Sequence, residues 1–499
     1  MKKILKNLLC VAVAFVCVFG FTACKVKVSD TTVDTSKTLY NGKTTNGGLT
    51  VKHDGYLYFI NGTKTNDGTS AKKNTRGGIC RVKLDDDGNA VKDTYEMVVD
   101  NLVGYDNGSL AIFGDFLYFT TPNDDVNYQD TKLYYQTNFM RYDLVNKKSY
   151  VLYTTKQNSS SEKISYAYYI VGQDLELLVY ETTNSTITSL KIDTNVTTNY
   201  VLNDVKSCVF SDNYGTCTTE NATVDANNFV YYTKNVDVYE DGRSTGNKVY
   251  KVSPNTDNSS IISNSENSIS LLSVRSGKLV YSSKSTSGND TIIYSQTITN
   301  SVDTLDFTGI VSYKTYDNVI FMDNTDGTVS AIAMDSDTNQ ILYLKADPSN
   351  KFEVTPVVIN TLQISSSSSS GSSSSSNKVS FVGLAELTED IKDEENEEGT
   401  KESKVTYLIY VYSNTVYKLE VMRDDAVSPL ADPVKLTKST VTAPSGTLVP
   451  DVIGNNLYIF AKELDDKNKE TSNIYLYQVD LTVKDDSTDY ATIIAKKEA

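Results

Sequence analysis

The chain has 499 residues and a formal net charge of −16. An acidic chain lacks the basic face that binds nucleic acid, so we expect no nucleic-acid partner. It has 35 tyrosines against 15 phenylalanines and no tryptophan, and tyrosine favours half-buried strand surfaces. The composition therefore predicts an all-β protein.

The amino terminus has the parts of an export signal. Lys2, Lys3 and Lys6 give it a positive start, and residues 8–21 are apolar or small. A transmembrane helix needs about 20 apolar residues to cross the bilayer core. Because this run is shorter, it indicates a cleaved secretory signal.

The end of this signal, Phe21-Thr22-Ala23-Cys24, resembles the bacterial lipobox, in which small residues precede a cysteine. The resemblance implies that Cys24 is acylated on sulfur and becomes the mature amino terminus. Two acyl chains anchor a protein stably, because each buried methylene contributes about 0.8 kcal/mol. We therefore expect residues 1–23 to be a lipoprotein signal peptide and the polar residues 24–47 to be a flexible tether. The alternative is an ordinary signal peptide that ends near a cysteine.

One unit recurs through residues 48–499: a turn with Gly, Asn or Asp, then four or five apolar and tyrosine-rich residues. Examples are DGYLYFI (54–60), GDFLYFT (114–120), DLELLVY (174–180), DNVIFMD (317–323), NKVSFVG (377–383) and GNNLYIF (454–460). A period of about 40–60 residues with about four short strands in each is typical of a β-propeller. Eight such units occur, so residues 48–499 predict a propeller of about eight, alternatively seven, four-stranded blades. An array of β-sandwiches is the rival architecture.

Residues 54–88, which contain DGYLYF and GGICRVKLDDDG, resemble a blade of a known kind. Bacterial extracellular propeller families related to the low-density-lipoprotein-receptor type have blades that read DGxIYY…LYRIxLDG. The resemblance recurs at 227–254 and fades between 300 and 450. It implies a propeller outside the cytoplasm, and its motif encodes packing rather than a site.

Two segments interrupt the repeated pattern. Residues 365–376 are eleven serines and one glycine, and residues 386–402 carry nine acidic and two basic side chains. Serine-rich and like-charged runs favour open, solvated chain. We expect an insertion at about 365–404 that protrudes from one face of the propeller. The functional alternative is a loop that binds a cation or a partner.

Three cysteines remain after the signal and the anchor are set aside. Cys208 and Cys217 lie nine apart around the turn-rich SDNYGT, so they form either a hairpin disulfide or two unpaired thiols. Cys80, in an apolar run, is interpreted as a core residue. The absence of any CxxC motif and the single histidine exclude a Cys/His zinc site.

Motifs for enzyme chemistry are scarce. His53 is the one histidine and is interpreted as an exposed turn residue, which leaves no base for a Ser-His or Cys-His pair. No G-x-S-x-G elbow, P-loop or dinucleotide pattern occurs. Residues 335–339, with Asp335, Asp337 and Asn339, and residues 85–89 have calcium-like oxygen donors, but both are interpreted as hairpin turns. We therefore expect no metal site and no cofactor.

These observations together predict a function only in outline. We expect a monomeric binding or scaffold propeller, lipid-anchored to the cell membrane and facing outside the cytoplasm, with an unknown protein, peptide or glycan partner. We expect it not to be an enzyme. The alternatives are an extracytoplasmic glycan-active enzyme that uses paired carboxylates and an envelope-assembly factor, which rests on architectural analogy.

Overall fold

The computed structural model describes the chain in the following ranges: 42–44, 50–61, 78–100, 103, 110–123, 135–171, 174–192, 195–210, 216–217, 230–235, 247–264, 268–275, 278–284, 291–297, 316, 318–323, 329–346, 354–362, 379–392, 400–437, 439–441, 451–453, 455–483 and 491–493. The signal peptide and the lipidation residue Cys24 lie outside these ranges. Within them, no helix is long and apolar enough to cross a membrane.

Short strands make up most of the described chain. The strands of its first half are β1 (Gly42–Thr44), β2 (Thr50–His53), β3 (Tyr56–Ile60), β4 (Ile79–Lys83), β5 (Glu96–Val99), β6 (Ala111–Phe113), β7 (Phe116–Pro122), β8 (Thr137–Asp143), β9 (Lys148–Thr154), β10 (Ile164–Val171), β11 (Asp174–Glu181), β12 (Thr186–Ile192), β13 (Val196–Leu202), β14 (Ser207–Phe210), β15 (Thr216–Cys217), β16 (Val230–Asn235), β17 (Asn247–Ser253) and β18 (Thr256–Asn264). Those of the second half are β19 (Ser268–Arg275), β20 (Lys278–Lys284), β21 (Thr291–Thr297), β22 (Asn318–Asp323), β23 (Val329–Asp335), β24 (Gln340–Ala346), β25 (Val354–Thr361), β26 (Ser380–Lys392), β27 (Thr400–Tyr412), β28 (Thr415–Arg423), β29 (Ala426–Val427), β30 (Val434–Lys435), β31 (Asp451–Ile453), β32 (Asn456–Leu464), β33 (Glu470–Asp480) and β34 (Ala491–Ile493).

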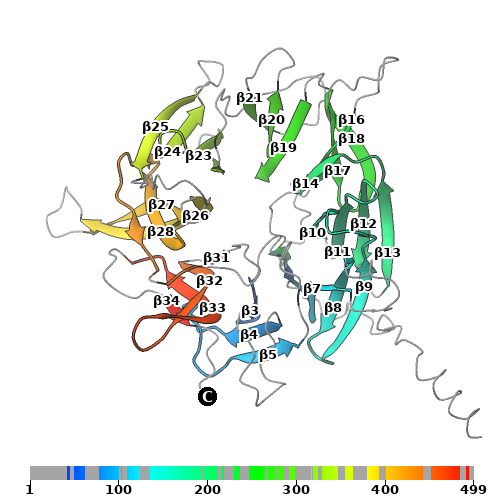
Figure 1. Cartoon of the computed structure of the whole chain (residues 1–499), viewed down its shortest axis with the longest axis horizontal. Helices are drawn as coiled ribbons and strands as arrows, with labels where there is room; N and C mark the ends of the chain where they lie inside the picture. Colours follow the sequence, from blue (N-terminus) through cyan, green and yellow to red (C-terminus); the bar gives the residue numbers. More distant parts are fainter. Residues whose placement is uncertain are drawn as a thin grey trace, which may run out of the picture.

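These strands form antiparallel sheets that follow one another around a ring (Figure 1). In the described ranges the sheets are β2-β3-β4-β5, β15-β1-β6-β7-β8-β9, β10-β11-β12-β13, β14-β16-β17-β18, β19-β20-β21, β22-β23-β24-β25, β26-β27-β28-β29 with β30 beside β28, and β31-β32-β33-β34. The predicted all-β propeller with four-stranded blades is confirmed. The blade number of eight or seven stays a prediction.

The core lies between neighbouring sheets, and β11 shows how one strand serves two of these interfaces. Leu177 and Val179 pack with Phe139 of β8 on one face, while Leu178 packs with Val230 of β16 on the other. A strand buried on both faces has a nearly continuous apolar sequence. This is the physical origin of the repeated apolar unit.

The ring closes where β31–β34 meets β2–β5, and among the strands that the structure describes none is shared between the two sheets. Gln478 of β33 donates to the Gly88 carbonyl at 3.4 Å and to Asn89 Oδ1 at 3.2 Å, and it accepts from the Ala90 amide at 3.3 Å. Tyr458 also donates to the Gly88 carbonyl at 3.4 Å. The turn that holds this carbonyl needs glycine, because φ at Gly88 is 83°.

The acidic segment differs from the expected insertion. Residues 386–392 belong to β26 and residues 400–404 to β27, and they pair from Glu386–Thr406 to Lys392–Thr400. The hairpin reaches outward from the ring (Figure 1). Backbone pairing therefore continues through a stretch whose charge favours open chain. The serine run lies outside the described ranges.

Candidate functional site

Two carboxylates lie on one face of β11, where the strand begins. Asp174 Oδ2 forms an ion pair with Lys191 Nζ at 2.7 Å, and Lys191 stands directly opposite Glu176 on β12. The Glu176 side chain is buried, with the residue only 2% exposed, in the interface towards the β14–β18 sheet. Side chains two apart on a strand point to the same face, about 7 Å along the chain. The two acids therefore share one environment.

Asn199 holds the Glu176 carboxyl in place. Its Nδ2 donates to Glu176 Oε2 at 2.6 Å and to Ser189 Oγ at 3.2 Å. The register between β12 and β13 shifts beside Ser189, which leaves Asn199 as the extra residue of a β-bulge. Bulges redirect side chains, and this one turns the Asn199 amide towards the buried acid.

The same cluster fastens the neighbouring sheet. Ser189 Oγ donates to the Pro254 carbonyl at 2.5 Å, and Tyr200 donates to the Ser253 carbonyl at 2.7 Å. Both acceptors lie at the turn between β17 and β18. Hydrogen bonds thus connect Glu176 through Asn199 and Ser189 to the next sheet of the ring.

Burial raises the pKa of Glu176 to about 7. The Asn199 hydrogen bond opposes this rise, the Asp174 carboxylate adds to it, and the Lys191 ammonium opposes it. A carboxyl that titrates near neutrality beside a second carboxylate can donate and accept a proton, which is the requirement for acid–base catalysis. This pair, Asp174 and Glu176, is the first candidate site.

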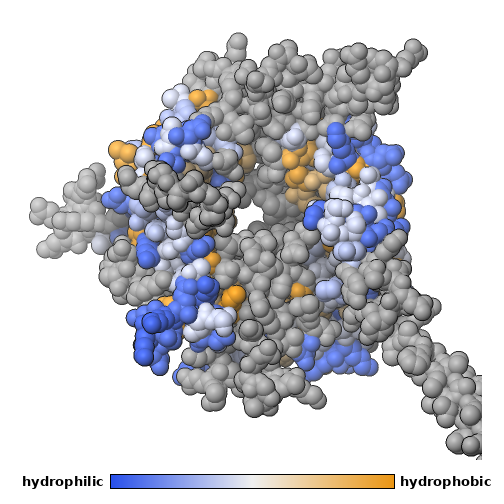
Figure 2. All heavy atoms as spheres, viewed as in Figure 1, coloured by the Kyte–Doolittle hydropathy of each residue, from blue (hydrophilic) through white to orange (hydrophobic). Residues whose placement is uncertain are grey.

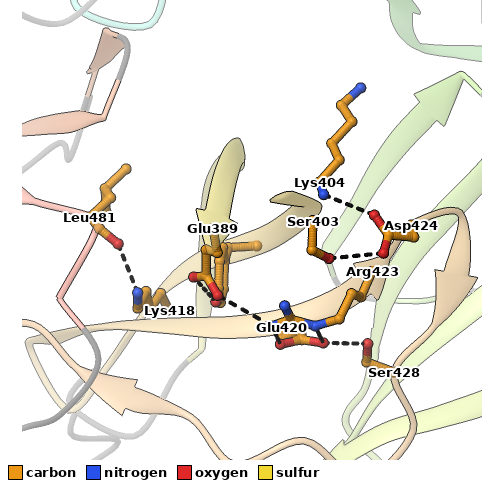
Figure 3. A network of polar contacts seen from close by, with 10 residues as sticks. Glu389, Ser403, Lys404, Lys418, Glu420, Arg423, Asp424, Ser428 and Leu481 are labelled. Carbon is orange, nitrogen blue, oxygen red and sulfur yellow. Dashed lines mark hydrogen bonds and ion pairs between the residues drawn. The ribbon is translucent and has the colours of Figure 1, made fainter. Parts of the chain in front are cut away.

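A second polar cluster lies at the base of the acidic hairpin (Figure 3). Arg423 Nη2 contacts Glu420 Oε2 at 2.6 Å and Glu389 Oε2 at 3.3 Å, while its Nε donates to Glu420 Oε1 at 3.0 Å. Tyr407 donates to Glu389 Oε1 at 2.6 Å, and Ser428 donates to Glu420 Oε1 at 2.7 Å. The guanidinium forms ion pairs with both acids, so the cluster joins β26 to β28.

Lys418 extends this polar cluster inside the protein, towards the next sheet. Its ammonium, on a residue only 1% exposed, lies 4.5 Å from the centre of the Tyr407 ring. It also donates to the Leu481 carbonyl at 2.7 Å (Figure 3). A buried cation is tolerated when a ring face and a carbonyl replace its water. The contact fastens β28 to the end of β33.

The inner wall of the ring is the third candidate. Figure 2 shows the ring hollowed at its centre. There β1 pairs with β6, the first strand of its sheet, and β15 pairs with β1. Two short segments from distant parts of the sequence thus extend one sheet towards the centre.

The structure describes two of the three cysteine side chains that follow the expected anchor, those of Cys80 and Cys208. Cys208 is a free thiol on β14, and the Cys217 side chain lies outside the described part, so the Cys208–Cys217 disulfide stays a prediction. Cys80 is buried, as expected, with its sulfur 3.0 Å from the Tyr95 hydroxyl. Burial raises the pKa of Cys80 to about 12, which keeps the thiol unreactive.

The interpretation of His53 as an exposed turn residue is wrong. It is the last residue of β2, its side chain is 9% exposed, and its Nε2 lies 3.2 Å from Asp54 Oδ2. Burial lowers its pKa, although Asp54 opposes the shift. The error arose because the Asp54-Gly55 turn begins one residue later.

The two calcium-like stretches form turns. Asp335 Oδ1 accepts the Asp337 amide at 3.1 Å, and Asp85 Oδ1 accepts the amides of Asp87 at 3.1 Å and Asn89 at 2.7 Å. These carboxylates cap their own turns. A search of the described residues finds no group of three or more His, Cys, Asp or Glu that could hold a metal ion.

Sequence reasoning missed Glu176 and Arg423. In DLELLVY, Glu176 is the one charged residue between Leu175 and Tyr180, and that run is buried on both faces. A charge inside such a run signals a buried carboxyl. Arg423 gives no comparable signal, because one of its two partners, Glu389, lies 34 residues away.

Fold and site together define the class of protein: an all-β propeller with carboxyls buried between its sheets. No protein-family model matches the chain, and no curated protein matches it. Among solved structures, the chain is similar to a puromycin hydrolase, with 11% identity and a TM-score of 0.41 over 76% of this chain and 52% of that one. It is also similar to the β-propeller domain of the Trilobed protease from Pyrococcus furiosus, with 9% identity and a TM-score of 0.33 over 75% and 94%.

An oligogalacturonate lyase in complex with manganese is a third similar structure, with 12% identity and a TM-score of 0.29 over 57% of this chain and 72% of that one. These likenesses concern the fold and assign no activity. The chain spans about half the length of the puromycin hydrolase. The prediction that the protein is not an enzyme is wrong, because the solved structures similar to this chain include enzymes: a puromycin hydrolase and an oligogalacturonate lyase.

Proposed function

We propose that the protein is a lipid-anchored propeller of eight blades that faces outside the cytoplasm and binds an extracytoplasmic partner. The sheets described above support the blade number, and the lipobox-like end of the signal supports the anchor at Cys24. One observation carries the binding role: the inner wall of the ring accepts added strands, since β1 and β15 extend the β6–β9 sheet towards the centre.

Two measurements on intact cells test this proposal. Cys24→Ala should abolish metabolic labelling with an acyl chain and release the protein from the membrane. Amine-reactive crosslinking followed by capture should recover a discrete partner with the wild-type chain and lose it with the released variant. A Cys24→Ala protein that remains membrane-bound contradicts the anchor, and crosslinking that yields no discrete species contradicts the binding role.

The Glu176 site favours a second candidate, a glycan-active enzyme outside the cytoplasm. In this function Glu176 donates a proton to the leaving oxygen and Asp174 acts as the base, because a carboxyl with a raised pKa and a neighbouring carboxylate can divide these roles. The supporting observation is the raised pKa of Glu176 beside the Asp174–Lys191 ion pair.

Release of reducing sugar from purified cell-envelope polysaccharide tests this candidate. Glu176→Gln should lower the rate by 100-fold or more, the order expected for loss of a general acid. Glu420→Gln, at the hairpin cluster, should leave the rate unchanged. Absence of release by the wild-type chain, or equal rates for Glu176→Gln and the wild type, rejects the enzymatic candidate and leaves the binding role in place.

A further inference from the structure

The strand β1 lies against the inner wall of the ring at several points. Its residues pair antiparallel with β6, with Gly42 opposite Phe113, Lys43 opposite Ile112 and Thr44 opposite Ala111. It also lies beside β2 and β10, the first strands of the two flanking sheets. Residues 42–44 therefore occupy a position where three sheets present their innermost strands.

The wall itself is buried, whereas its added strand is short. Ala111 and Ile112 are fully buried and Phe113 is 5% exposed, all within the cores that join the sheets. The pairing of β1 spans three residues and that of β15 spans two. A hydrogen bond contributes about 1 kcal/mol net. Because β1 is so short, it is held only weakly on β6.

Strand addition to a sheet edge is a general means of binding an extended peptide, because the backbone groups of the edge supply the contacts. The occupant already present shows what fits: the Gly42-Lys43-Thr44 segment of this chain, with small or polar residues and antiparallel to β6. A partner segment of the same kind can make the same ladder.

We propose that β6 is a strand-addition site for an extended, small-residue peptide segment of a partner protein, which takes the place of residues 42–44. The inference rests on the proposed binding role and names its partner class. Because residues 42–44 lie within the expected tether, residues 24–47, uptake of a partner frees the tether from the ring. Partner binding and the reach of the anchor are thereby coupled.

Two variants of the full chain in detergent, one locked and one open, test the site. Thr44→Cys with Ala111→Cys places thiols on directly opposite residues, whose Cα atoms in an antiparallel pair are about 4.5–5.5 Å apart, within the span of a disulfide. Lys43→Pro removes a backbone donor and opens the strand. The probe is a fluorescent synthetic peptide with the sequence of residues 39–47, LYNGKTTNG.

The open variant should bind the probe at least tenfold more tightly than the wild type does. The oxidised locked variant should not bind it, and reduction should restore the wild-type affinity. A probe with proline in place of its lysine is the matched control and should not bind. Failure of the disulfide to form in folded protein, no binding by the open variant, or equal binding by the locked chain overturns the inference. If one of these results is found but the wild-type chain still captures a partner from cells, the strand-addition site is wrong and the proposed binding function is retained.

Discussion

Glu176 and Glu420 are carboxyls of two different sheets, and their surroundings move their pKa values in opposite directions. Burial raises the pKa of Glu176 to about 7, with one amide and a nearby ammonium opposing the rise. Burial also acts to raise the pKa of Glu420, but hydrogen bonds from Arg423 and Ser428 outweigh it and lower the pKa below its usual value. The two residues therefore form a matched pair for a pH experiment.

Glu176→Gln should stabilise the protein at pH 8 and leave its stability unchanged at pH 4. The folded state holds a proton on Glu176 that the unfolded state has lost, so wild-type stability from this group falls as pH rises from about 4.5 to about 7. At 1.36 kcal/mol for each pKa unit, the difference at pH 8 reaches roughly 3 kcal/mol. Urea unfolding at pH 4, 6 and 8 measures it.

Glu420→Gln should show the opposite sign. A carboxyl with a lowered pKa contributes stability above its unfolded pKa, and that contribution disappears as pH falls through the folded value. The variant should therefore be weaker than the wild type at pH 8 and equal to it well below pH 4. Identical pH profiles for the two glutamine variants would refute the assignment of opposite shifts.

Arg423→Met should cost about 3 kcal/mol, because it leaves Glu389 and Glu420 facing each other without their cation. Adding Glu389→Gln to Arg423→Met should recover part of the loss, since one of the two charges is then removed. A double-mutant cycle on the free energy of unfolding measures the coupling. Additive single effects would show that Glu389 and Arg423 do not interact.

At the scale of elements, the repeated tyrosine-rich unit predicted where strands occur, but it did not predict the position of each strand within its sheet. The units at 54–60 and 174–180 form β3 and β11, the second strands of their sheets. The units at 317–323 and 377–383 instead became β22 and β26, first strands. An apolar run reports burial on two faces, and first and second strands of a propeller blade can both meet that condition.

Bulges explain why the site residues were harder to foresee. The register between β27 and β28 shifts so that Thr406 faces Met422 and Tyr407 faces Glu420, which leaves Val421 as an extra residue. Glu420 and Arg423, three apart in sequence, therefore reach the same side of the strand. Hydrophobic patterning does not encode such a shift.

The acidic loop between β26 and β27 is expected to be dispensable for the pairing of these two strands. Residues 393–399 hold five acids and no basic residue, and Lys392 and Thr400, which flank them, are directly paired. Replacing 393–399 with Asn-Gly should retain the ladder, because this dipeptide suits a two-residue hairpin turn, and loop length changes stability by only about 0.6 kcal/mol for each doubling. Melting temperature and strand hydrogen exchange should match the wild type. Loss of protection in β26 and β27 would mean that the acidic residues stabilise the hairpin.

At the scale of the whole molecule, composition and period sufficed for the propeller, because most of its described sheets are built from consecutive strands; β1 and β15, from distant parts of the sequence, are the exception at the β6 edge. Ring closure depends on side chains far apart in sequence, such as Gln478 and the turn at Gly88. Contacts of this kind come from the tertiary arrangement. The anchor prediction at Cys24 rests on local sequence alone and stays a prediction.

Gln478→Leu should loosen the closure of the ring. The variant removes the acceptor of the Ala90 amide and the donor to Gly88, for an expected loss of about 2 kcal/mol. Hydrogen exchange should rise at the Ala90 amide and in β31–β34, while β10–β13 keep their protection. Lys467→Ala, at an exposed residue of the β32–β33 turn, is the control. A uniform rise around the ring would contradict a local seam.

Binding at the inner wall is tested by crosslinking capture on intact cells with the wild-type chain and with the Thr44→Cys, Ala111→Cys variant, before and after reduction. We expect a discrete partner with the wild type, none with the oxidised variant, and recovery of the same partner when the disulfide is reduced. Equal recovery from the oxidised and reduced variant would contradict binding at the inner wall.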